Sequence, residues 1–110
     1  HPCSNVPFTG YGGIDQWALE DVFCCKRDGV YVDIGAANSW KISNTYSMDV
    51  FLGWKGVCVD AMFDDPEGFR YTRSCTQKQV AVWTASGETR RFTRPFRLTA
   101  SRIPYGHGWA

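Results

Sequence analysis

Acidic side chains follow two apolar runs of the sequence, at points where a ligand could be held. The first run, residues 30–34, contains Asp33 and leads into Gly35; the second, residues 56–60, ends in Asp60. In an open α/β sheet, ligands bind beyond the carboxyl ends of the strands. Glycine lets the backbone approach a ligand closely, and an acid ending the next strand can accept hydrogen bonds from ribose hydroxyls. The pattern predicts a nucleoside site, although Asp60 alone also fits a solvated loop acid.

Helices and strands that alternate along the chain would position these side chains. Amphipathic spacing predicts a helix over residues 14–25, which the Lys26–Gly29 stretch would end. A second helix would be capped by Ser43 or Asn44 and would stop at Gly53. Buried strands are predicted at 30–34 and 56–60, a third helix at about 64–74, a third strand at 79–83, and a fourth strand at 89–93 in a hairpin. From Pro95 onward no regular pattern is visible.

This order predicts an α/β fold with a mainly parallel sheet of three to four strands and flanking helices, because strands joined through helices run parallel. It corresponds to a truncated Rossmann-like arrangement. We expect an irregular lead-in at residues 1–13, a half-domain at 14–93 and an irregular basic and aromatic tail at 94–110. A chain of 110 residues has room for one small core.

Three sequence blocks, VDIGA at 32–36, SNT at 43–45 and LGWKG at 52–56, carry a resemblance. In this order and spacing they resemble the FkbM family of S-adenosylmethionine-dependent methyltransferases, over roughly residues 14–93. The resemblance implies a Rossmann-like methyltransferase fold and a cradle for S-adenosylmethionine. Carried over residue by residue, the implied cofactor-binding residues are Asp33, Gly35, Ala36, Asn38, Ser39 and Asp60.

The sequence also departs from the family pattern. Ala37, Asn38 and Ser39 stand where the family typically has Asn-Asp-Gly, a bulky Trp40 follows, and Asp60 replaces a usual glutamate. The family's later strands, with the acidic motif on the acceptor side, have no counterpart after Thr93. Two hypotheses remain. The one we favour is a non-catalytic, pseudoenzyme-like domain that serves as a structural or interaction subunit of a protein assembly. The other is an active methyltransferase, seen as a fragment or completed by another chain.

The five cysteines form no CxxC pair, and their odd number argues against a disulfide framework. We therefore expect buried free thiols in a reducing, intracellular compartment. A zinc site would need well-spaced ligands, so no metal is expected. No apolar run reaches the length of a membrane-spanning helix. No nucleophile can be placed beside a histidine, because His1 and His107 stand near opposite ends, and the catalytic residues stay unknown.

Charge is distributed unevenly: residues 1–67 hold ten acids against four Lys and Arg, and residues 68–110 hold one against eight. The basic part could dock on an anionic partner, or the two parts could neutralise each other on one surface. Basic residues alternate with aromatics in the tail, a pattern that can bind single-stranded nucleic acid. No RNA-binding motif accompanies it. We therefore expect protein partners that cover the tail and the incomplete sheet, rather than nucleic acid.

Overall fold

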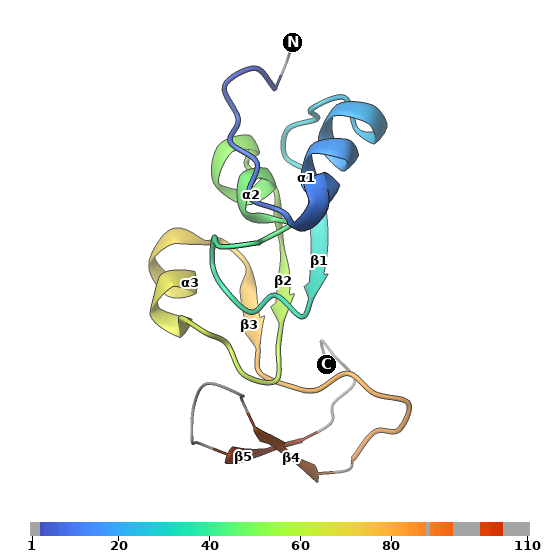
Figure 1. Ribbon diagram of the computed structural model, residues 1–110, viewed down its shortest axis with the longest axis vertical. Helices are drawn as coiled ribbons and strands as arrows, with labels where there is room; N and C mark the ends of the chain where they lie inside the picture. The colour runs from blue at the N-terminus through green and yellow to red at the C-terminus, as the bar shows by residue number, and fades with distance from the viewer. Residues whose placement is uncertain (1–2, 88, 94–99, 105–110) are drawn as a thin grey trace.

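The computed structural model describes residues 3–87, 89–93 and 100–104, with side chains described as far as Thr89. Figure 1 shows helices packed along a small sheet, and a separate two-stranded ribbon at the other end of the molecule from α1. In chain order the elements are η1 (Tyr11–Gly13), α1 (Ile14–Trp17), η2 (Ala18–Val22), β1 (Val30–Ile34), α2 (Tyr46–Leu52), β2 (Lys55–Val59), α3 (Pro66–Thr72), β3 (Thr76–Lys78), β4 (Thr89–Thr93) and β5 (Ala100–Pro104).

The main sheet has the order β1-β2-β3, and both of its strand pairs are parallel. β1 and β2 pair in register from Val30 opposite Lys55 to Ile34 opposite Val59. This confirms the expected α/β class with a parallel sheet and flanking helices, and it is compatible with a Rossmann-like fold. The carboxyl ends of β1 and β2 lie side by side, which is where the sequence predicts the ligand site.

The helix boundaries follow local signals that the sequence displays. Ser43 Oγ accepts hydrogen bonds from the Thr45 and Tyr46 N–H groups, at 3.3 and 3.1 Å, just before α2, whereas the N-cap position itself is held by Thr45, not by the predicted Ser43 or Asn44. Gly53 ends α2 with a φ of 72°, a left-handed conformation that glycine adopts at little cost. The first helix ends at Val22, earlier than the predicted residue 25, because Cys24 and Cys25 both have positive φ.

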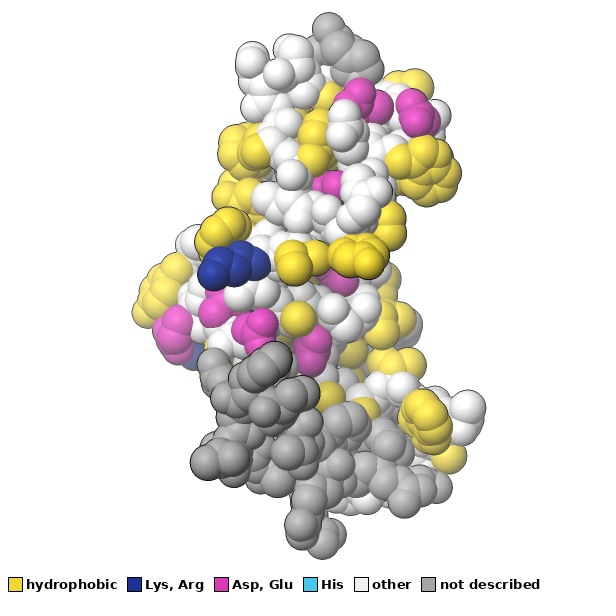
Figure 2. Space-filling view, in the orientation of Figure 1, with side chains coloured by type: hydrophobic (Ala, Val, Ile, Leu, Met, Phe, Trp, Pro, Cys, Tyr) yellow, Lys and Arg dark blue, Asp and Glu magenta, His cyan; other side chains and the backbone are white. Residues whose placement is uncertain are grey.

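One face of β1 is exposed, so the expectation of a buried strand was wrong for that face. Val30, Val32 and Ile34 are 80%, 52% and 56% exposed, whereas Tyr31 between them is 6% exposed. Alternate strand residues point to opposite faces of a sheet, and only the Tyr31 face packs against the core. Figure 2 shows that hydrophobic side chains also reach the surface elsewhere on the molecule.

The third strand begins and ends earlier than predicted. β3 covers Thr76–Lys78, and residues 79–83 contain only an isolated bridge at Ala81. The reason lies just before β3: a disulfide joins Cys75 to Cys58 near the end of β2, so the residues directly after Cys75 lie alongside β2. β4 forms as expected but pairs antiparallel with β5 instead of residues 79–83. The apolar pattern of residues 79–83 did not indicate that β4 would pair with β5.

The expectation of free thiols was also wrong for most cysteines. The structure pairs Cys3 with Cys25 and Cys58 with Cys75, and leaves Cys24 as an exposed free thiol. The odd count hid the pairing, because one unpaired cysteine sits next to a paired one in the sequence. The case for a reducing compartment rested on free thiols and no longer holds, since stable disulfides are typical of oxidising environments.

Candidate functional site

A cavity of about 320 Å³ lies at the carboxyl ends of β1 and β2. Its volume is at the lower end of the range of roughly 300–1,000 Å³ found for small-molecule sites. Most of its wall is apolar, and one carboxylate residue contributes to it. The lining residues are Ile34, Gly35, Val59, Asp60, Ala61, Val80, Ala81, Val82 and Trp83.

Asp60 follows β2 directly and is held in place by two backbone groups. One carboxylate oxygen accepts the Ala37 N–H at 2.9 Å, and the other accepts the Met62 N–H at 2.8 Å. A carboxylate offers about four acceptor positions, so roughly two remain for a ligand. The same side chain therefore orders the loop after β1 and keeps the capacity to accept hydrogen bonds from a diol.

Gly35 forms the floor of the cavity where β1 ends. Its φ is 78°, and a methyl group added there would meet no atom within 4 Å. The Gly35 and Ala36 N–H groups both donate to the Val59 carbonyl, at 2.8 and 3.1 Å. Glycine is required here by the backbone conformation, and the open space above it leaves room for a ligand. Ala36 points away, since it is buried in the core.

The other predicted cofactor-binding residues make contacts within the protein. Asp33 accepts a hydrogen bond from the Thr45 hydroxyl at 2.5 Å. Asn38 folds back on its own loop, where its side-chain oxygen accepts two backbone N–H groups. Ser39 is buried and hydrogen-bonds to Asp65 through its N–H and its hydroxyl. Of the predicted set, the structure thus brings only Gly35 and Asp60 together at the cavity.

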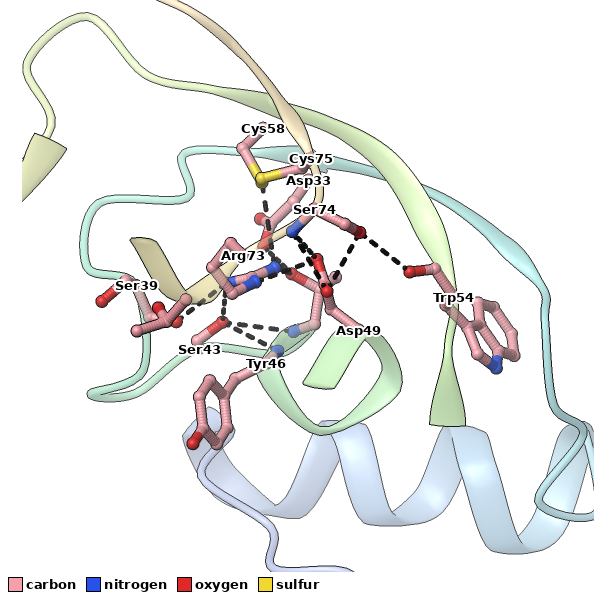
Figure 3. A network of polar contacts seen from close by, with 12 residues as sticks. Asp33, Ser39, Ser43, Tyr46, Asp49, Trp54, Cys58, Arg73, Ser74 and Cys75 are labelled. Carbon is pink, nitrogen blue, oxygen red and sulfur yellow. Dashed lines mark hydrogen bonds and ion pairs between the residues drawn. A yellow bond between two sulfur atoms is a disulfide. The ribbon is translucent and has the colours of Figure 1, made fainter. Parts of the chain in front are cut away.

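A buried polar network supports the loop between β1 and α2 from beneath (Figure 3). Arg73, directly after α3, forms an ion pair with Asp49 of α2 at 3.2 Å, and both side chains are almost fully buried. The guanidinium also donates to the Ser39 carbonyl at 2.9 Å and to the Thr45 hydroxyl at 2.7 Å. Because Thr45 in turn donates to Asp33, the network connects α3, α2, β1 and the loop.

Tyr31 of β1 completes the network and is itself buried, at 6% exposure. Its hydroxyl donates to Asp49 at 2.5 Å and accepts from Arg73 at 3.0 Å. Burial, followed by the hydrogen bond to Asp49, raises the pKa of Tyr31 well above its ordinary value of 10.0, despite the opposing effect of Arg73. Tyr31 is therefore a permanently protonated donor at any physiological pH.

Two groups of residues that shape this region could not be recognised in the sequence. Residues 80–83 form a cavity wall, but the prediction of a third strand at 79–83 placed them inside the sheet. Arg73 carried no functional motif, and only its position two residues before Cys75 could have indicated that it is held close to β2. A basic residue predicted on an exposed helix end is ordinarily solvated.

The described part of the chain shows two further absences. Among the residues that the structure describes, no group of three or more His, Cys, Asp or Glu side chains could hold a metal ion. Within the same residues, no helix combines the length and apolar character needed to cross a membrane.

Comparisons with known proteins do not extend this picture: no family model, no curated protein and no solved structure matches the chain. The resemblance to FkbM methyltransferases rests on the three sequence blocks themselves.

Proposed function

We propose that this chain is a methyltransferase-like module that binds a nucleoside cofactor of the S-adenosylmethionine type and works within a larger protein assembly. The observation that carries the proposal is the cavity beside Gly35 and Asp60 at the carboxyl ends of two parallel strands. Parallel α/β sheets bind nucleotides at this position. The VDIGA block runs through the end of β1 to Gly35 at the cavity, whereas the LGWKG block leads into the amino end of β2, whose opposite end reaches the cavity.

The residues at the cavity fit a nucleoside in chemical terms. Asp60 would accept the ribose hydroxyls through its remaining acceptor positions, and Gly35 leaves space beside the backbone. Trp83 and the aliphatic residues before it supply a flat, apolar wall suited to an adenine ring. A bound S-adenosylmethionine would supply an electrophilic methyl group on its sulfonium. The contribution of this chain would be to hold and orient the nucleoside.

Calorimetry with S-adenosylhomocysteine tests the binding proposal. We expect a dissociation constant in the micromolar range, and a loss of at least about tenfold in affinity for Asp60→Ala, because hydrogen bonds to a charged group are lost. Glu67→Ala is the matched control, since this exposed acid lies on α3 and pairs with the equally exposed Arg70. Thermal unfolding would confirm that each variant is folded. Equal binding by wild type and Asp60→Ala, or no binding by folded wild type, would contradict the proposal.

Trp83 provides an independent readout. An adenine stacked on its ring would quench its fluorescence, and Trp83→Phe would remove that signal while retaining an aromatic wall. Quenching that persists unchanged in Trp83→Phe would place the ligand elsewhere.

The role within an assembly is favoured by the uncovered face of β1. Parallel sheets are normally covered on both faces, yet Val30, Val32 and Ile34 are exposed on one of them. We expect a protein partner to cover this face. Sedimentation velocity of the purified chain should show self-association that Val32→Glu abolishes. If the wild type stays strictly monomeric at high concentration, the exposed face of β1 is not an association surface.

The disulfides extend the proposal to the compartment: the chain would fold in an oxidising environment. Mass spectrometry of alkylated protein isolated from its natural source should find Cys24 alone modified. Modification of all five cysteines would restore the reducing compartment first expected.

A further inference from the structure

The disulfide between Cys58 and Cys75 lies against the buried guanidinium of Arg73. Arg73 Nη2 and the Tyr31 hydroxyl are each 3.8 Å from Cys58 Sγ. Cys58 is fully buried at 0% exposure, and Cys75 is 9% exposed. Figure 3 shows the Cys58–Cys75 disulfide and Asp49 of α2 both next to Arg73. Cys58 Sγ therefore has the guanidinium cation as a neighbour, and the Tyr31 hydroxyl beside it gives its own proton to Asp49.

The Arg73 cation favours cleavage of the disulfide in one direction. A cation next to a cysteine lowers the pKa of its thiol, and a thiol of lower pKa is the better leaving group in thiol–disulfide exchange. The attacking thiolate of a dithiol reductant would form a bond to the more accessible Cys75 Sγ, and Cys58 would leave as a thiolate beside Arg73. The second thiolate of the reductant then displaces Cys75. The reductant becomes a disulfide, and both protein sulfurs end as thiol or thiolate after proton uptake.

Opening this bond would act directly on the loop at the cavity. Arg73 and Ser74 immediately precede Cys75, and the disulfide fixes this stretch to β2. Arg73 holds the Ser39 carbonyl and the Thr45 hydroxyl, and Ser74 donates to Asp49 through its N–H and its hydroxyl. A Cys58 thiolate would compete with these acceptors for the guanidinium. Reduction thus removes a covalent tether and redirects the cation that holds residues 39–45.

We propose that the Cys58–Cys75 disulfide is a reducible latch that a dithiol reductant opens, loosening the loop of residues 35–45 and weakening ligand binding at the cavity. The loosening of the loop stands by itself, whereas the loss of binding rests on the proposed function. The remainder of the sheet stays folded, because the parallel pairing of β1 with β2 does not depend on the bond.

Hydrogen-exchange mass spectrometry on the full chain tests the latch without any ligand. The starting protein is Cys3→Ala/Cys25→Ala, in which the reductant can act only on Cys58–Cys75. With dithiothreitol, we expect amide exchange in residues 35–45 to rise at least about tenfold, the effect of losing one charged hydrogen bond. Exchange in β1 and β2 should stay slow. Alkylation and mass measurement would confirm that the bond is open.

A second variant distinguishes the effect of losing the disulfide from any other effect of dithiothreitol. Cys58→Ala/Cys75→Ala should show the fast loop without reductant, and dithiothreitol should change its loop no further. The latch is overturned if residues 35–45 exchange equally before and after proven reduction. The proposal is also overturned if β1 and β2 lose protection together with the loop, because the disulfide would then stabilise the whole fold.

Binding of S-adenosylhomocysteine, measured on the same samples, distinguishes the two proposals. Tight binding by the oxidised protein and a loss of about tenfold or more on reduction, the range for charged hydrogen bonds, supports both. A loop that loosens on reduction in a protein that never binds the nucleoside supports the latch and refutes the proposed function. Unchanged affinity after loosening of the loop refutes the control of binding.

Discussion

Replacing Arg73 by methionine tests whether the buried network holds the loop and helices together. The change keeps much of the side-chain volume and removes the charge from a side chain that is 0% exposed, leaving Asp49 at 4% exposure without its cation. Breaking a buried ion pair by removing one partner costs about 3–5 kcal/mol. Asp49 keeps donors from Tyr31 and Ser74, so we expect Arg73→Met to lower the free energy of unfolding by about 3 kcal/mol, the lower end of that range.

Urea denaturation with both disulfides intact would measure this loss, and Arg70→Met is the matched control. Arg70 lies on α3, which ends directly before Arg73, and pairs with Glu67 at 3.6 Å, but both side chains are 66% exposed. Exposed pairs contribute about 0–1 kcal/mol, so the control should unfold almost like wild type.

A double variant refines the argument. Arg73→Met together with Asp49→Leu removes both charges, and apolar replacement of a whole buried pair is often far less costly than breaking it. The double variant should therefore be more stable than Arg73→Met alone. If Arg73→Met costs no more than Arg70→Met, the ion pair does not stabilise the protein and the reasoning about the loop fails with it.

Three further predictions concern Tyr31, Gly29 and Cys24. Stability should fall as pH rises above about 10, because unfolded tyrosine ionises there while folded Tyr31, with its raised pKa, keeps its proton; urea unfolding from pH 8 to 11 should show a shallower fall for Tyr31→Phe. Gly29→Ala would place a methyl group 2.5 Å from the Trp54 ring, and we expect a loss of about 1–3 kcal/mol from overpacking, measured by denaturation; a neutral result would show that the indole can move. Cys24→Ser changes an exposed thiol and should alter thermal stability by less than about 0.5 kcal/mol.

The order of helices and parallel strands could be predicted because its signals are local. The β-branched run at β1, the Ser43 hydroxyl that accepts the Tyr46 N–H, and Gly53 at the end of α2 each act within a few residues. The third strand could not be placed correctly, because its register depends on Cys75 meeting Cys58 across the fold. Apolar patterning at 79–83 could not distinguish a strand from a cavity wall.

The candidate site shows the same difference between residues set by local signals and residues set by long-range contacts. Gly35 and Asp60 were predictable because strand ends define them. Asn38 and Ser39 were assigned from a motif. Asn38 instead accepts two N–H groups of its own loop, and Ser39 bonds to Asp65, a partner that the sequence does not place nearby. The role of Arg73 could not be predicted from the sequence, because its partners come from β1, the following loop and α2.

The placement of the two disulfides has a consequence for oxidative folding. One bond closes residues 3–25 and the other residues 58–75, so the two covalent rings neither overlap nor enclose each other. Each can form independently, and no order of oxidation is imposed. The hazard lies in the adjacent pair at 24 and 25: Cys24 is exposed and stands one residue from the correct partner of Cys3. Refolding in air would therefore scramble chiefly at the amino-terminal ring, and Cys24→Ser would give a single connectivity there.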